Sequence, residues 1–384
     1  MRSRDRLALD SIIDLSDNLL IIVPPFINSL LSSIIFLIER FKKNLITHIT
    51  LLTLDSLDEL NEVINRYSSI LFVDPPIVIK NNKITNSLNG KRVFAISKDD
   101  VEWVNADVSL NYSESLPQLI WQLLDDELSR DSLRFLETAV VYESTITPNY
   151  DASSFNGWST TESINYPSLP GILRLPLAVA LSRTFSPIIP GITGNETEAR
   201  SLVKTISKRT DIMYKDLSEN EVMALIKYLS DFVLRAGLRG EYLDKLLSTF
   251  RKWSDSTIDV LESILAIESQ LALWEYVGGI MSPIINPQSV KDMDNLITKY
   301  ISILSNYLGQ LIKGGEIVVE CNQPLTLIDR LCSIINFFTE SRNQVFLLQE
   351  KNMQINCVFG EETTDTDLLF KRDNYLISIK GPLQ

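Results

Sequence analysis

Short apolar runs alternate with amphipathic stretches over the first hundred residues. The apolar runs predict strands at residues 19–23, 46–54, 69–74 and 92–97, and the stretches between them predict helices that include residues 29–41 and 56–66. Nearly continuous apolar strands separated by helices are typical of a parallel sheet covered on both faces. Because ligands gather at the carboxyl ends of such strands, we expect any site in the loops after Val23, Val73 and Ile96.

One almost uncharged segment, residues 19–38, is long enough to span a membrane. Pro24 and Pro25 interrupt it, and a proline pair breaks a helix because each ring removes an N–H and clashes with the preceding turn. The segment therefore favours a buried strand, a loop and a helix. A membrane-associated protein anchored by this segment is the alternative, and it predicts detergent dependence.

The second half of the chain is mainly helical. It follows residues 144–171, whose Ser, Thr, Asn and Pro content predicts a long loop or linker. Ser218 and Glu221 form a capping box, in which each side chain satisfies a free backbone N–H at the start of a helix. Further predicted elements are helices at residues 257–277 and 288–313, a strand at 316–320, and a hairpin of 345–349 with 353–359.

The composition of the chain argues against several kinds of binding and catalytic site. The net charge of −13 argues against strong DNA binding by the isolated chain, because proteins that follow a phosphate backbone carry a basic face. Three widely spaced cysteines indicate a reducing compartment without a disulfide framework, and they match no zinc-binding pattern. The single histidine, His48, is expected to pack within its apolar strand. Any enzyme built on this chain would have to work through carboxylates.

Several short segments follow one another in a specific order. Pro25-Phe26-Ile27-Asn28-Ser29 comes after the first strand, Asp74 ends another, and Ser97-Lys98-Asp99 ends the next, with Asn105 shortly behind. Glu143 closes the predicted helix 136–143, and the run Phe185-Ser-Pro-Ile-Ile-Pro-Gly-Ile-Thr-Gly194 lies further on. In order and spacing these segments resemble the motifs of the RecJ-type DHH phosphoesterases, in which the first motif reads His-Asp-x-Asp-Gly and the third Asp-His-His.

The resemblance implies the metal site of these phosphoesterases without the side chains that its catalysis requires. The family hydrolyses phosphodiesters with two divalent ions held by Asp and His side chains. Of the vestigial site positions Phe26, Asn28, Asp74, Lys98 and Glu143, only Asp74 and Glu143 are acidic, too few to hold two ions. We therefore expect no catalytic residues, no metal and no cofactor. Lys98 is expected to form an ion pair with Asp74 that fills the vacated site.

The surrounding charge agrees with this interpretation. Residues 99–151 carry twelve Asp or Glu against Arg130 and Arg134. Such a field would oppose a phosphate backbone. The alternative is that these carboxylates simply lie on solvated helix faces.

The resemblance also implies an α/β fold with three parts. They are a parallel-sheet DHH-like domain at residues 1–195, a helical connector at 196–285, and a small α/β DHH-associated-like domain at 286–384. Degenerate members of this kind resemble the cell division control protein 45 family, together with its archaeal counterparts.

That family implies a non-catalytic accessory subunit of the archaeal CMG replicative helicase in DNA replication. Its implied partners are the GINS complex and, through GINS, the MCM helicase, with a weak or indirect contact to single-stranded DNA left open and no membrane. The implied location is cytoplasmic and nucleoid-associated. The partner surface is expected among the amphipathic helices of residues 196–313. The alternative is a divergent but active DHH-type single-strand DNA exonuclease or phosphoesterase, which manganese-dependent nucleotide release would reveal.

Overall fold

The structure is a computed structural model. It describes residues 2–380 except 55–56, 81, 114, 125–127, 148–149, 151, 186–187, 190, 236, 238–239, 248–249, 274–278, 314–316, 321–323, 337–343, 349–352, 360–365 and 373–374.

Five parallel strands form the sheet that the N-terminal apolar runs predict. They are β1 (Leu19–Val23), β2 (Thr47–Leu51), β3 (Ser69–Val73), β5 (Arg92–Ser97) and β6 (Val108–Asn111), in the order β2-β1-β3-β5-β6. Every residue of β1 and β3 is buried, as expected of apolar strands covered on both faces. The predicted α/β fold class and the predicted strands are confirmed.

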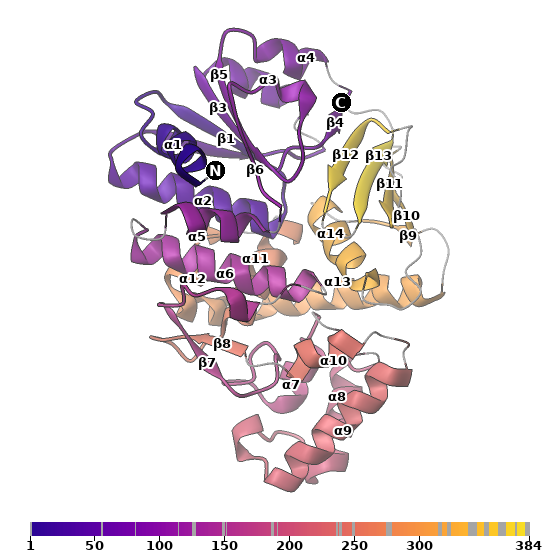
Figure 1. The fold of residues 1–384 in the computed structure, drawn as a ribbon. Coiled ribbons are helices and arrows are strands. Elements are labelled where there is room, and N and C mark those ends of the chain that lie inside the picture. The colour runs from indigo at the N-terminus through magenta and orange to yellow at the C-terminus, as the bar shows by residue number, and fades with distance from the viewer. Residues whose placement is uncertain are drawn as a thin grey trace.

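Helices cover this sheet (Figure 1). They are α1 (Arg2–Ile13), α2 (Ile27–Lys42), α3 (Leu57–Asn65), α4 (Asn82–Ser87), α5 (Leu116–Leu124) and α6 (Arg130–Ile146). A short 3-10 helix, η1 (Glu102–Val104), precedes β6. The helix α2 starts directly after Pro25, with Phe26 as its N-cap residue, and it packs against both β2 and α6. The proline pair thus separates a strand from a helix, as predicted.

A second, smaller hydrophobic core lies in a helical lobe, here residues 164–250. Its secondary structure is α7 (Leu177–Ser182), α8 (Glu196–Ser207), η3 (Tyr214–Asp216), α9 (Glu219–Arg235), α10 (Gly240–Leu247) and β8 (Phe250–Trp253). The buried residues of this core run from Leu169 to Phe250. The capping box is confirmed, because the backbone N–H of Ser218 donates to Glu221 Oε2 at 2.7 Å and Glu221 N–H donates to Ser218 Oγ at 3.4 Å.

Helices also connect the two ends of the molecule. They are α11 (Val260–Leu273), α12 (Ser282–Ile285), the 3-10 helix η5 (Pro287–Met293), α13 (Asp294–Lys313) and α14 (Pro324–Ile335). The helix α11 packs against α6, α13 and α14 and belongs to the main core. The smaller core draws its residues from 164–250, and Phe185, Ile188, Val233 and Tyr242 of the same range pack in the main core. The domain limits at 195 and 285 stay a prediction.

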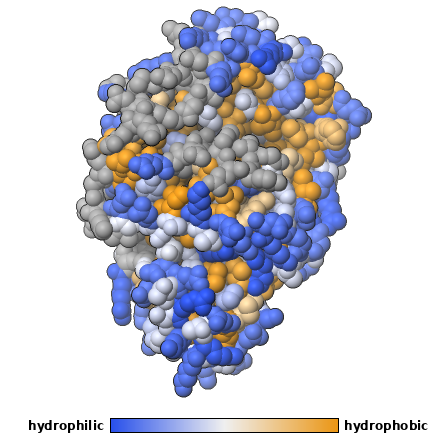
Figure 2. All heavy atoms as spheres, turned by 180° about the vertical axis from the view of Figure 1, so that it is seen from behind, coloured by the Kyte–Doolittle hydropathy of each residue, from blue (hydrophilic) through white to orange (hydrophobic). Residues whose placement is uncertain are grey.

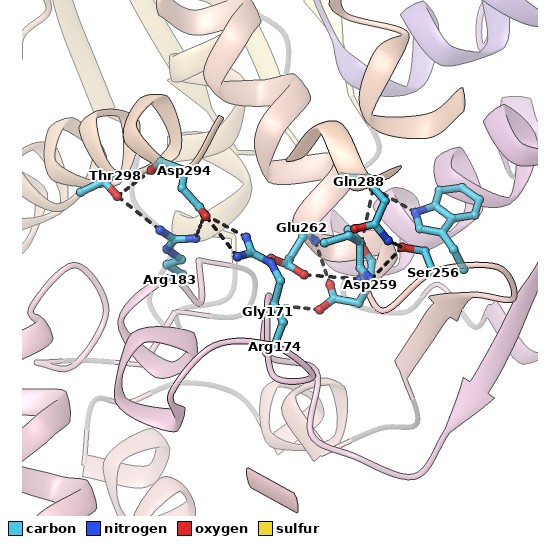
Figure 3. Close-up of polar contacts among 12 residues, drawn as sticks. Gly171, Arg174, Arg183, Ser256, Asp259, Glu262, Gln288, Asp294 and Thr298 are labelled. Atoms are coloured by element: carbon cyan, nitrogen blue, oxygen red, sulfur yellow. Dashed lines mark hydrogen bonds and ion pairs between the residues drawn. The ribbon is translucent and has the colours of Figure 1, made fainter. Parts of the chain in front are cut away.

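A network of ion pairs fixes the helical lobe to these helices (Figure 3). Arg174 contacts Glu262 of α11 at 2.7 Å and Asp294 of α13 at 2.8 Å, and Arg183 contacts Asp294 at 2.6 Å. Asp259, which precedes α11, accepts a hydrogen bond from Gly171 N–H at 2.8 Å. Burial and the neighbouring Glu262 raise the pKa of Asp259 well above its usual value. Burial likewise raises the pKa of Glu262, although Arg174 opposes this.

A six-stranded sheet completes the C-terminal part. Its order is β4 (Val78–Ile79), β12 (Leu368–Lys371), β13 (Leu376–Lys380), β11 (Met353–Val358), β10 (Gln344–Leu348) and β9 (Ile317–Val318). The predicted hairpin is confirmed as the antiparallel pair β10–β11. The strand β4 comes from the N-terminal part of the chain and pairs with β12. An N-terminal segment and the C-terminal strands thus share one sheet.

Three expectations are wrong. Residues 144–171 are not one long loop, because α6 runs to Ile146 and the segment contains η2 (Ala152–Ser154) and β7 (Thr161–Ile164), which pairs with β8. His48 is exposed rather than packed, since β2 is an edge strand, and its ring contacts Tyr67 at 5.4 Å between centroids.

The third concerns the cysteines. Cys332 of α14 and Cys357 of β11 form a disulfide, with 5.9 Å between their Cα atoms. The packing of α14 on the sheet brings them together, and their spacing gives no sign of it.

Among the described residues, no helix is long and apolar enough to cross a membrane.

Candidate functional site

A small pocket lies at the carboxyl ends of the parallel strands, where the loops after β1, β3 and β5 converge. Four predicted site residues, Asn28, Asp74, Lys98 and Glu143, line it together. The other lining residues are Tyr112, Ser115, Leu116, Lys371 and Arg372. The predicted meeting of these four positions is confirmed, whereas their descent from metal ligands stays a prediction. We call this the carboxyl-end pocket.

Asp74 is held at the end of β3 in a defined orientation. Its backbone has the left-handed conformation, with φ of 48°, and its N–H donates to Ile96 O at 2.8 Å. Ser29 Oγ donates to Asp74 Oδ2 at 2.6 Å, and Tyr112 Oη donates to Asp74 Oδ1 at 2.7 Å. Burial and the adjacent Asp74 carboxylate raise the pKa of Tyr112 well above its usual value. The phenol therefore stays a proton donor to this carboxylate.

Glu143 and Asn28 come from neighbouring helices. Glu143 lies in the last turn of α6, is 4% exposed, and accepts a hydrogen bond from Thr147 Oγ1 at 2.9 Å. Asn28 lies in the first turn of α2 and is 5% exposed, and its Oδ1 has no hydrogen-bond partner. A buried carbonyl oxygen without a donor is uncommon.

Lys98 lies directly after β5 and lines the same pocket as Asp74 and Glu143. Its expected ion pair with Asp74 stays a prediction.

Phe26 occupies a different place from the other predicted positions. Its side chain is 2% exposed and packs edge-to-face on Phe370 of β12, with 5.2 Å between ring centroids. The guanidinium carbon of Arg372 lies 4.6 Å from the centroid of the Phe26 ring. Where the resemblance would place a carboxylate, this chain thus has an apolar contact to the C-terminal sheet.

Three further positions from the family motifs lie outside the pocket lining. Asn105 is exposed and ends η1 in the left-handed conformation. Asp99 forms an ion pair with Lys371 at 2.9 Å. Gly194, at the end of the Phe185–Gly194 segment, has φ of 72°, and a Cβ atom there would lie 2.3 Å from Ser305 of α13. This glycine is required for close packing between the helical lobe and α13.

Sequence reasoning missed the contribution of the C-terminal sheet. Lys371 ends β12 and Arg372 follows it, far in sequence from every N-terminal motif. Arg372 contacts Asp329 of α14 at 2.9 Å, and Tyr375 Oη donates to the same carboxylate at 2.8 Å. The only available signal was a pair of basic residues at the end of an apolar strand, which is common in any sheet.

The donor set of the carboxyl-end pocket does not fit divalent metals. Two such ions need several oxygen or imidazole ligands, and here two carboxylates and one amide oxygen face three cationic side chains. The cavity volume is about 20 Å³, room for roughly one water molecule. Within the described ranges, no group of three His, Cys, Asp or Glu side chains is arranged to hold a metal ion.

The fold belongs to a recognisable structural class. No protein-family model matches the chain, and a search of curated proteins finds no match. Several solved structures do match, and a CDC45 among them gives the chain a Cdc45-like fold, which confirms the predicted resemblance at the level of fold.

One of these structures is CDC45 from Entamoeba histolytica. It matches with a TM-score of 0.60 at 9% identity, over 98% of this chain and 95% of that chain. RecJ from Thermus thermophilus in complex with Mn²⁺ matches with a TM-score of 0.45 at 11% identity, over 98% of this chain and 51% of that chain. An exonuclease RecJ bound to manganese matches with a TM-score of 0.41 at 9% identity, over 94% and 83% of the two chains.

Proposed function

We propose that this protein is a non-catalytic, Cdc45-like accessory subunit in DNA replication. The observation that carries the proposal is the carboxyl-end pocket, where Lys98, Lys371 and Arg372 surround two carboxylates in the place of a metal site. The positive charge of these three side chains opposes the binding of two dications in the same pocket. The chemistry of a two-metal nuclease has no support in these residues.

The proposed partners are GINS and, through it, the MCM helicase ring. Similarity to CDC45 over nearly the full length of both chains supports a protein of the same architecture. A protein without chemistry of its own acts through its contacts. On this proposal the chain would stabilise the assembled helicase.

The surface offers apolar groups for such contacts. On α9, Met223 is 66% exposed and Leu234 is 70% exposed, and eleven residues of spacing place them on one side of the helix. Patches of hydrophobic side chains also lie between hydrophilic ones on the face shown in Figure 2. Exposed apolar groups that gather on a lone chain commonly mark protein interfaces. We therefore place the partner surface on the exposed side of α9.

Co-migration tests this proposal. The purified chain is mixed with purified GINS and run on a sizing column, with mass determination of each peak. A joint peak whose mass equals the sum of the two components is expected. Separate elution at micromolar concentrations of both components would count against GINS as the partner.

An exonuclease assay tests the alternative function. Single-stranded DNA labelled at the 5′ end is incubated with the protein and Mn²⁺ or Mg²⁺, and the same reactions with added chelator are the control. We expect no chelator-sensitive release of nucleotides. Release that requires the metal would favour the divergent DHH-type exonuclease.

A further inference from the structure

The C-terminal sheet contributes two cationic residues, Lys371 and Arg372, to a pocket that N-terminal strands, loops and helices otherwise line. Arg372 follows β12, and its backbone N–H donates to Tyr375 O at 2.9 Å. Its side chain is only 10% exposed. Arg372 lines the pocket together with Asp74 and Glu143, which lie in a different part of the fold.

Two contacts hold the guanidinium in place. Asp329 of α14 lies 2.9 Å away, and the centroid of the Phe26 ring lies 4.6 Å from the guanidinium carbon. Burial alone would lower the pKa of Arg372, but the negative charges of Asp329 and, to a smaller extent, Glu143 raise it above its ordinary value. Arg372 is therefore a permanent positive charge.

One buried carboxylate, Glu143, and one half-buried carboxylate, Asp74, need charge compensation if no metal is bound. An unpaired charge in a buried place is costly unless a counter-charge or proton neutralises it. We propose that Arg372 is a resident cation of the carboxyl-end pocket, beside Lys98 and Lys371, and that it gives Asp74 and Glu143 part of the charge compensation that a divalent metal would provide. This inference rests on the proposed absence of catalysis, and it goes further by naming one group that replaces the metal.

The assignment has a structural consequence. Because Arg372 belongs to the C-terminal sheet, the pocket is complete only when the two sheets are docked. The edge-to-face contact of Phe26 with Phe370, the ion pair of Lys371 with Asp99, and the pairing of β4 with β12 act in the same direction. These three contacts therefore hold the two sheets together beside the pocket.

A double-mutant cycle on the full-length protein tests the inference. Arg372→Met and Glu143→Gln are made singly and together, and the melting temperature Tm is measured by calorimetry at pH 7. We expect Arg372→Met to lower Tm by about 4–6 °C, as for loss of one partner of a buried pair in a chain of this size. Glu143→Gln should restore at least half of that loss in the Arg372→Met background and should not raise Tm in the wild type.

A parallel cycle with Asp329→Asn is the matched control, because Asp329 also contacts Arg372 but lies outside the pocket lining. The inference is wrong if Glu143→Gln changes Tm equally in the wild type and in the Arg372→Met variant, while the effect of Asp329→Asn on Tm depends entirely on Arg372. Arg372 would then act only within the C-terminal sheet. Should Arg372→Met fail to fold, Arg372→Gln removes the same charge, keeps hydrogen-bonding groups, and gives the same cycle. Metal-dependent nuclease activity of the wild type would overturn the proposed function instead, independently of this coupling.

Discussion

The ion pairs between the helical lobe and α11 give the most direct test of how the parts of the molecule are held together. Substitution of Arg174 by Met keeps most of the side-chain volume but removes the charge that faces Glu262 and Asp294. The Arg174 side chain is 14% exposed and that of Glu262 only 2%. Glu262 would then lie buried beside Asp259, which is fully buried, without its cationic partner.

The expected magnitude follows from this burial. Breaking a buried pair by removing one partner costs about 3–5 kcal/mol, because the remaining charge is left without compensation. We expect Arg174→Met to lower the free energy of unfolding by about 3–4 kcal/mol, since Asp294 is one-third exposed and keeps Arg183 as a partner. Glu262→Gln in the Arg174→Met background should recover part of this loss.

Urea denaturation followed by circular dichroism gives the measurement, at pH 7 and again near pH 4.5. Burial raises the pKa of Glu262 even with Arg174 present, and loss of Arg174 should raise it further. The folded variant would then hold a proton that the unfolded chain releases, so its stability should fall as pH rises through this range. The difference from the wild type should therefore be larger at pH 7 than at pH 4.5. A loss below about 0.5 kcal/mol at both pH values would refute the reasoning, because it is the value of an exposed pair.

Three further outcomes are expected. Lys98→Ala should lower Tm by about 4–6 °C in a calorimetric scan, as for one member of a buried pair, and a change below about 1 °C would show that the pocket leaves Lys98 solvated. Millimolar Mn²⁺ should shift the wild-type Tm by less than about 1 °C, whereas saturation of a real site would raise it by several degrees in the same scan. Met223→Ser combined with Leu234→Ser should abolish co-migration with GINS on the sizing column without lowering Tm, and Phe41→Ser, an equally exposed substitution on α2, should leave it intact.

The parallel sheet could be predicted from the sequence because its signals are local. Apolar runs, the break at Pro24 and Pro25, and the capping box at Ser218 each depend on neighbouring residues. The placement of Asn28, Asp74 and Lys98 also followed from local order, since all three come after parallel strands whose carboxyl ends meet at one edge of the sheet.

The errors and omissions concern contacts between distant segments. The strand β7 exists only through its pairing with β8, and the polar composition of residues 144–171 gives no indication of that partner. The exposure of His48 depends on which strand ends the sheet, a property of strand order rather than of residue type. Arg372 enters the pocket because two sheets dock, and no motif of the N-terminal half points to it. Local sequence patterns predict the helices and strands, whereas the packing of distant segments against one another determines that Arg372 lines this pocket.

The pairing of β4 with β12 has a consequence for how the chain reaches its native state. Leu368 and Leu369 of β12 are buried, and the two residues Val78 and Ile79 occupy the edge where their backbone groups would otherwise be open. An uncovered apolar edge strand is a template for pairing with another molecule, and so for aggregation. A separately expressed C-terminal fragment would lack this cover and should self-associate. In the full-length chain, β4 supplies this cover.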